Sequence, residues 1–299
     1  MQGKVLFAQL LMQMLSVVRL PIFWIMLVLL TLQIGSNVWR RESWLWQQKQ
    51  VVYRLPVFLF YVLEQLVSVL LVSIPVGVIA SSFLIWTGVS VDISAMPYLW
   101  AVMLILFCIR RRFVCFAYAG GILAVLEGIS NLFVFDGRGV LMLTAVLHFT
   151  EAMLVCMSGI WQSCPVSMRS ADGAAIHRTQ LQMIWPLPLI MPMHTMTSGM
   201  LPSGYIVMPE WWPVFAGVMP GQETAALYVL VPTLAVIGYH DAAEYQREKQ
   251  HCCGAALLLL GYSVLLGIIV MASRDVPLLL SVAGLFSILG HEAIARIPH

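Results

Sequence analysis

The sequence predicts an all-α polytopic transmembrane helical bundle, and three observations lead to this fold class. Of its 299 residues, 61% are apolar. Only 10% are charged, against roughly 25% in an average soluble domain. The charged residues gather in short islands between long apolar runs, because an unpaired charge in hydrocarbon costs several kcal/mol. This composition excludes a soluble globular domain, a disordered chain and a secreted disulfide scaffold.

Continuous apolar runs define the predicted spans, since a helix needs about 20 apolar residues to cross a bilayer and a barrel would show alternation instead. In chain order the runs are 20–34, 58–86, 97–109, 113–135, 140–161, 181–208, 225–239, 254–272 and 277–289. Residues 5–18 are apolar but interrupted by Gln and Ser, and we expect them at the interface or at the start of the first span. The chain is thus a single integral membrane domain, residues 1–299, with about eight or nine crossings.

Two of these spans carry helix-breaking residues. Pro75 and Gly77 predict a kink in the span 58–86. The run 181–208 is rich in Pro and Met, so its helix is expected to be broken, and residues 183–239 cross the membrane either once or twice. Broken backbone at membrane depth needs a protein wall or a water-filled cavity.

The basic residues predict the orientation, because Lys and Arg stay on the cytoplasmic side. If the loop around Arg40 is cytoplasmic, alternation places twelve of the sixteen basic residues inside and puts the C-terminus in the cytoplasm. The inner set is Arg40, Arg41, Lys49, Arg54, Arg110, Arg111, Arg112, Arg169, Arg178, Arg247, Lys249 and Arg296. The outer set is Lys4, Arg19, Arg138 and Arg274. The net charge of +2 gives no basic domain suited to nucleic acid.

His148 and Glu151 form the candidate polar pair inside the membrane. They are three residues apart and therefore share one face of a helix. Such a pair can act as a proton relay or as half of a metal site. It can equally be a satisfied interhelical polar contact that positions two spans, and we favour this second interpretation.

His291 and Glu292 form a second candidate, at the end of the last span. A zinc-protease helix reads H-E-x-x-H, but here Ala295 stands where the second histidine would be, so that motif fails. We interpret the pair as a polar cap where the chain leaves the membrane. The remaining polar residues within apolar runs are Glu64, Glu127, Asn131 and His194.

No catalytic, cofactor-binding or metal-ligand set emerges from the sequence. The six cysteines, which include Cys115, form no C-x-x-C pair, and we interpret them as reduced packing residues. Met191, Met193, His194 and Met196 form a weak candidate for copper. Phosphate-binding loops and nucleophile elbows are missing from the sequence. We therefore expect a non-enzyme without cofactor or metal.

Several stretches, in their order along the chain, resemble a known family. They are Arg40-Arg41-Glu42, RRFVCFAYAGG (111–121), HFTEA (148–152), LQMIWPLP (181–188), VIGYHD (236–241) and GHEA (290–293). Together they resemble the membrane region of Firmicutes PDZ-domain membrane proteins, the group that includes the MinJ-type division-site topology factors. In that family a cytoplasmic PDZ domain follows the membrane region. We expect it to be absent from this chain, so peptide binding is carried over to no residue here.

Two functions are compatible with these observations. The resemblance implies a non-enzymatic membrane scaffold that positions cell-division or envelope proteins in the cell membrane, with the lipid bilayer and cytoplasmic division proteins as partners. Its contact surfaces would be the loops 35–55, 162–179 and 240–251. The alternative is a transporter or channel in which His148, Glu151 and Glu127 line a path.

Overall fold

The computed structural model describes residues 12–49, 55–130, 135–161, 163–169, 175–197, 211–215, 225–244, 247–274 and 276–296. The helices in these ranges are α2 (Pro21–Lys49), α3 (Leu55–Thr87), α4 (Met96–Ile109), α5 (Phe116–Ile129), α6 (Gly137–Ser158), α7 (Glu248–Ala272) and α8 (Leu278–Ile294). The strands are β1 (Val91–Asp92), β2 (Cys164–Arg169), β3 (Ala175–Thr197) and β4 (Ala225–Glu244). Two short 3-10 helices, η1 (Ile93–Ala95) and η2 (Arg111–Phe113), flank α4.

Among the described residues, four helices are long and apolar enough to cross a membrane: α3, α6, α7 and the Pro21–Trp39 part of α2. Helices α4 and α5 have 14 residues each, or about 21 Å, which is shorter than a hydrocarbon core of about 30 Å. Large apolar side chains such as Trp24, Leu71, Leu104 and Leu257 face outward. The helical membrane class is therefore confirmed, whereas eight or nine helical spans are not.

The prediction of an all-α fold is wrong for two segments. The predicted spans 181–208 and 225–239 form strands where they are described, and β3 and β4 pair as a long antiparallel hairpin. Strand β2 pairs antiparallel with the start of β3, and β1 pairs parallel with it near Met193. Burial alternates at Leu181, Met183 and Trp185, which is the period of a strand. Every residue from 185 to 190 is buried, as in a strand that is covered on both faces.

The prolines of β3 explain why a strand replaces the expected broken helix. Pro186, Pro188 and Pro192 lie at even positions, the same parity as Ile190. The backbone N–H of Ile190 donates to Ser81 Oγ of α3 at 2.9 Å, so N–H groups of this parity point away from β4. Proline lacks that N–H, and it is tolerated where the ladder does not need one. The prolines therefore leave the pairing with β4 intact.

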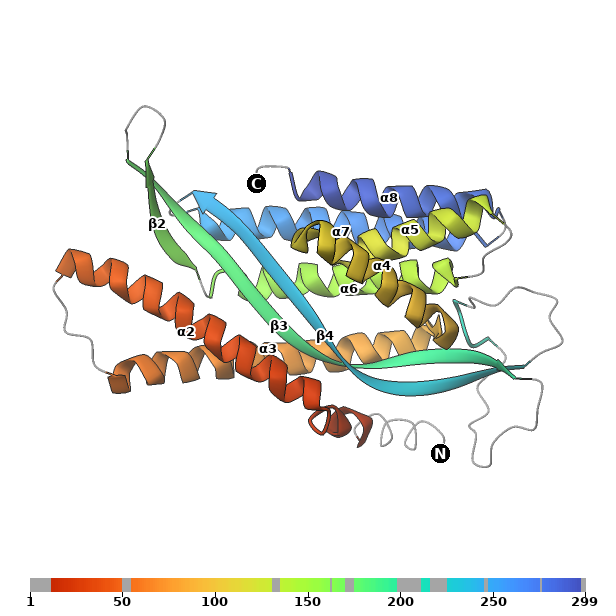
Figure 1. The fold of residues 1–299 in the computed structure, drawn as a ribbon, viewed down its shortest axis with the longest axis horizontal. Helices are drawn as coiled ribbons and strands as arrows, with labels where there is room; N and C mark the ends of the chain where they lie inside the picture. Colours follow the sequence, from red (N-terminus) through yellow and green to blue (C-terminus); the bar gives the residue numbers. More distant parts are fainter. Residues whose placement is uncertain are drawn as a thin grey trace.

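The hairpin returns to the end of the molecule from which it starts. Arg178 near the start of β3 is paired with Glu244 at the end of β4. Figure 1 shows β3 and β4 running the length of the bundle, with the start of β3, the end of α2 and the start of α7 gathered at one end. The segment before the hairpin, β2, and the segment after it, α7, therefore begin or end at the same end of the bundle.

Helices α5 and α8 approach closely because small residues face each other. A Cβ added at Gly284 would lie 2.6 Å from the carbonyl oxygen of Gly121, and one at Gly121 would lie 2.8 Å from the carbonyl oxygen of Gly284. Contacts between small residues allow such approach in membrane helices. This packing brings the start of α5 and the end of α8 together beside the middle of α6.

Candidate functional site: a cysteine–histidine cluster between three helices

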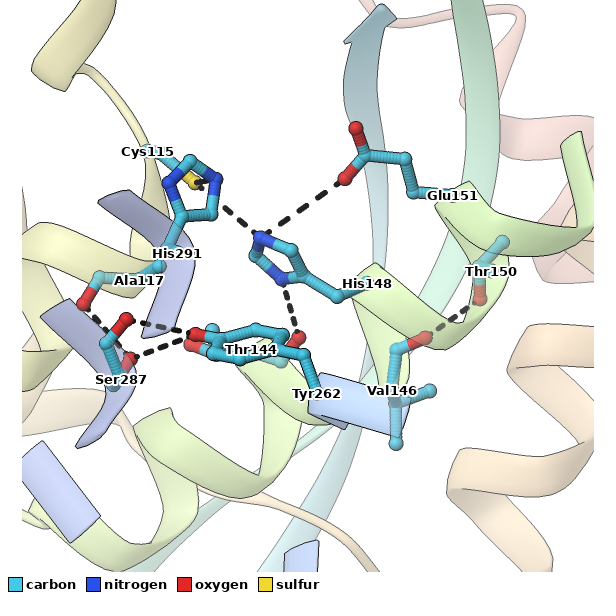
Figure 2. Close-up of polar contacts among 10 residues, drawn as sticks. All are labelled: Cys115, Ala117, Thr144, Val146, His148, Thr150, Glu151, Tyr262, Ser287 and His291. Atoms are coloured by element: carbon cyan, nitrogen blue, oxygen red, sulfur yellow. Dashed lines mark hydrogen bonds and ion pairs between the residues drawn. The ribbon is translucent and has the colours of Figure 1, made fainter. Parts of the chain in front are cut away.

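Three side chains that are distant in the sequence meet between α5, α6 and α8. Cys115 immediately precedes α5, His148 lies at the middle of α6, and His291 lies in the last turn of α8. Cys115 Sγ is 3.7 Å from His148 Nε2 and 3.7 Å from His291 Nε2. One ligand atom from each residue lies within 4.8 Å of the other two, which is close enough to hold a metal ion (Figure 2).

The hydrogen bond on the far side of His148 determines which ring nitrogen faces the cluster. His148 Nδ1 is 2.9 Å from the carbonyl oxygen of Thr144, one turn earlier on α6. A carbonyl oxygen only accepts, so Nδ1 carries the proton and donates. In the neutral ring Nε2 then presents a lone pair toward Cys115. Hydrogen bonds of this kind commonly orient metal-binding histidines.

Glu151 places a carboxyl group beside the cluster. Its Oε2 is 3.9 Å from His148 Nε2, on the same face of α6. Figure 2 shows its carboxylate approaching His148 from the side opposite to Thr144. The two residues of the predicted polar pair are therefore neighbours, and the pair is joined by groups from two other helices.

Aromatic rings enclose the two histidines. The ring centroids of His148 and His291 are 5.1 Å apart, and His148 lies 5.3 Å from Tyr262 of α7. Tyr118 lies 5.0 Å from His291. Tyr262 is itself held in place, because its hydroxyl donates to the carbonyl oxygen of Ser287 at 3.0 Å. These contacts restrict the orientations of both imidazoles before any ligand binds.

Glu292 points away from the cluster, toward basic residues. Arg112 Nη2 donates to Glu292 Oε1 at 2.6 Å, and Arg296 Nε donates to the same oxygen at 2.7 Å. Tyr118 donates its hydroxyl proton to Oε2 at 2.6 Å. The interpretation of a polar cap applies to Glu292, whereas the adjacent His291 turns inward to Cys115.

Glu127 lies at the opposite end of α5 and organises the start of α6. Its Oε2 accepts hydrogen bonds from the backbone N–H groups of Phe135 at 3.1 Å and Gly137 at 2.7 Å. Asp136, the residue before α6, has the left-handed φ of 51° and accepts from the N–H of Gly139 at 3.1 Å. Burial raises the pKa of Asp136 to about 7, against the effect of its backbone hydrogen bonds. Glu127 therefore has a bonding role that does not need a transport path.

Replacement of Glu127 by Ala is expected to lower the free energy of unfolding by about 1–3 kcal/mol, because two backbone N–H groups lose their acceptor. Glu127→Gln keeps an acceptor oxygen and should lose less. Thermal unfolding of the detergent-solubilised protein measures both. Equal melting temperatures for wild type and Glu127→Ala would show that these hydrogen bonds contribute nothing.

The other polar residues predicted inside spans also have local partners or lie elsewhere. His194 Nδ1 is 3.0 Å from Ser90 Oγ, beside the β1–β3 pairing. Glu64 is exposed on α3, and Asn131 lies outside the described residues. Of the copper candidates, Met191 is partly buried on β3 and Met193 is buried. A cavity of about 330 Å³ elsewhere in the bundle has apolar walls, formed by Phe83, Val146, Phe149 and Ile268 among others.

Sequence reasoning identified His148 and Glu151 as one unit and His291 as part of another, but it missed Cys115. Cys115 is 33 positions from His148 and 176 from His291 along the chain. No local spacing joins residues so far apart. The one available signal was the position of Cys115 three residues after the arginines Arg110–Arg112, near the start of an apolar run.

Comparison with protein-family models, with curated proteins and with solved structures finds no match for this chain.

Proposed function

We propose that this protein is a non-enzymatic integral membrane scaffold of the cell membrane, which positions division or envelope proteins at its cytoplasmic end. The proposal rests on the contacts of the ionisable groups within the predicted spans, which pair with neighbouring parts of the protein. His148, Glu151 and Glu127 contact side chains or backbone of neighbouring elements. None of these three residues lines the apolar cavity of about 330 Å³ or a smaller one formed by Val89, Arg138 and Phe215 among others.

The arrangement of the three predicted contact loops supports the same proposal. The end of α2 with the start of α3, the end of β2 with the start of β3, and the end of β4 with the start of α7 lie at one end of the molecule (Figure 1). Arg247 and Lys249 are exposed at the start of α7. Such an end, facing the cytoplasm, offers both a basic surface for anionic lipid and a platform for proteins.

A flux assay on the protein reconstituted into liposomes distinguishes the scaffold function from the transporter function. We expect neither proton nor ion flux from the wild-type protein under an imposed gradient, and no difference on His148→Ala. In cells, a fluorescent fusion should gather at the division site, and a photo-crosslinker at Lys249 should capture a division protein. The matched control is a crosslinker at Arg274, beyond the other end of α7. Flux that His148→Ala abolishes would overturn the proposal in favour of a transporter.

A further inference from the structure

Two of the three separations in the cluster formed by Cys115, His148 and His291, those from the sulfur to each histidine, match the distances around a bound zinc ion. Zinc bonds of about 2.3 Å to sulfur and about 2.0–2.1 Å to nitrogen place a tetrahedral sulfur and nitrogen about 3.6 Å apart. Both sulfur–nitrogen separations in the cluster are 3.7 Å. One ion bound to the sulfur and to both Nε2 atoms would account for the two contacts together.

The ligand atoms face one another in a usable chemical form. The Nδ1 proton of His148 is committed to the carbonyl oxygen of Thr144, so Nε2 is the free lone pair. His291 also directs Nε2 to the sulfur, and the rings of Tyr118 and Tyr262 pack against it. Its Nδ1 is buried without a hydrogen-bond partner among the described residues, so packing alone orients this ring. Thiolate sulfur together with imidazole nitrogen is the donor set that zinc prefers.

The charges of the site also balance. A buried ion without countercharge is costly in a medium of low dielectric constant. The Cys115 thiolate and the Glu151 carboxylate each carry one negative charge, and together they neutralise a divalent cation. Glu151 Oε2 lies 3.9 Å from His148 Nε2, which places the carboxyl group beside the three ligands, on the side of His148.

We propose that Cys115, His148 and His291 bind one Zn²⁺ ion, with Glu151 at the fourth coordination position. The ion cross-links the start of α5, the middle of α6 and the end of α8. This inference goes beyond the scaffold function, because metal binding does not depend on which proteins the scaffold positions.

Metal content and cobalt spectroscopy test the site. The intact chain, purified in detergent without chelator, should contain one equivalent of zinc by mass spectrometry. Exchange of zinc for Co²⁺ should produce the thiolate-to-cobalt charge-transfer absorption and the intense visible bands of a tetrahedral ion. His148→Ala and His291→Ala should reduce the zinc to background. Cys115→Asp should retain part of the zinc and lose the charge-transfer band. Glu151→Gln should keep the stoichiometry and weaken the affinity.

The experiment also includes a control variant at another cysteine and a measurement on the wild-type protein. Cys108 is exposed on α4, so Cys108→Ser should keep zinc and the cobalt spectrum unchanged. For wild-type protein, a chelator should lower the melting temperature and added Zn²⁺ should restore it, so the test does not depend on a variant that folds. Wild-type protein without zinc and without a cobalt spectrum would overturn the proposal. Equal zinc content in a folded Cys115→Ser, His148→Ala, His291→Ala triple variant would do the same.

Discussion

Replacement of Trp185 by Ala is expected to lower the free energy of unfolding by about 3–5 kcal/mol, the usual cost of truncating a buried tryptophan. Trp185 lies in the first half of β3, and its side chain is 0% exposed within the core shared with α3, α6 and α7. Its Nε1 also donates to Ser158 Oγ of α6 at 3.0 Å. The side chain thus attaches the hairpin to the helices by both packing and a hydrogen bond. Thermal unfolding in detergent measures the loss.

Two further variants separate those contributions. Trp185→Phe keeps most of the packing but no donor, and Ser158→Ala leaves the indole N–H without its acceptor, at a cost of about 1–3 kcal/mol. Trp86, which is 65% exposed at the end of α3, is the matched control. Trp86→Ala should change stability by less than about 0.5 kcal/mol. Similar losses for Trp86→Ala and Trp185→Ala would contradict the buried position of β3.

Replacement of Gly77 by Ala is expected to cost about 1–3 kcal/mol by overpacking, and to loosen the hairpin from α3. A Cβ at this position would lie 2.3 Å from the carbonyl oxygen of Pro188 and 3.2 Å from its ring. A backbone oxygen cannot rotate away as a flexible side chain would, so the strand or the helix must move. Hydrogen exchange should therefore become faster throughout β3 and β4, alongside the lower melting temperature.

Gly261 of α7 is the matched control, since a Cβ there would meet nothing within 4 Å. Gly261→Ala should be neutral or slightly stabilising, because Ala has the higher helix propensity. If Gly77→Ala leaves both melting temperature and exchange at wild-type values, then the hairpin does not pack on α3 as described.

The lipid environment of this protein was easier to predict from the sequence than its secondary structure. Long apolar runs identify a lipid environment whatever structure they adopt, so α3, α6 and α7 were placed close to their observed bounds. The run from residue 181 was assigned to a broken helix, because the prolines were weighed for what they do to helices. Their shared even parity, together with large apolar residues at the odd positions 181–189, was the available sign of a strand that needs no N–H on one edge.

Only the part of the candidate site that is close together in the sequence could be predicted. His148 and Glu151 are one helical turn apart, so their proximity follows from helix geometry alone. The approach of Cys115 and His291 depends on how closely α5 and α8 pack at Gly121 and Gly284. That packing is tertiary, and no periodicity in the sequence reports it. The failure of H-E-x-x-H at Ala295 excluded one zinc motif but carried no information about ligands from other helices.

The β3–β4 hairpin also constrains how the protein is made. A helix satisfies its own backbone and can enter the bilayer from the insertion machinery as soon as it is synthesised. An isolated strand cannot, because its open edge would meet hydrocarbon. We therefore expect the two strands to pair with each other before they enter the bilayer and pack against α3. Membrane insertion of this chain would then not follow the order in which its segments are synthesised.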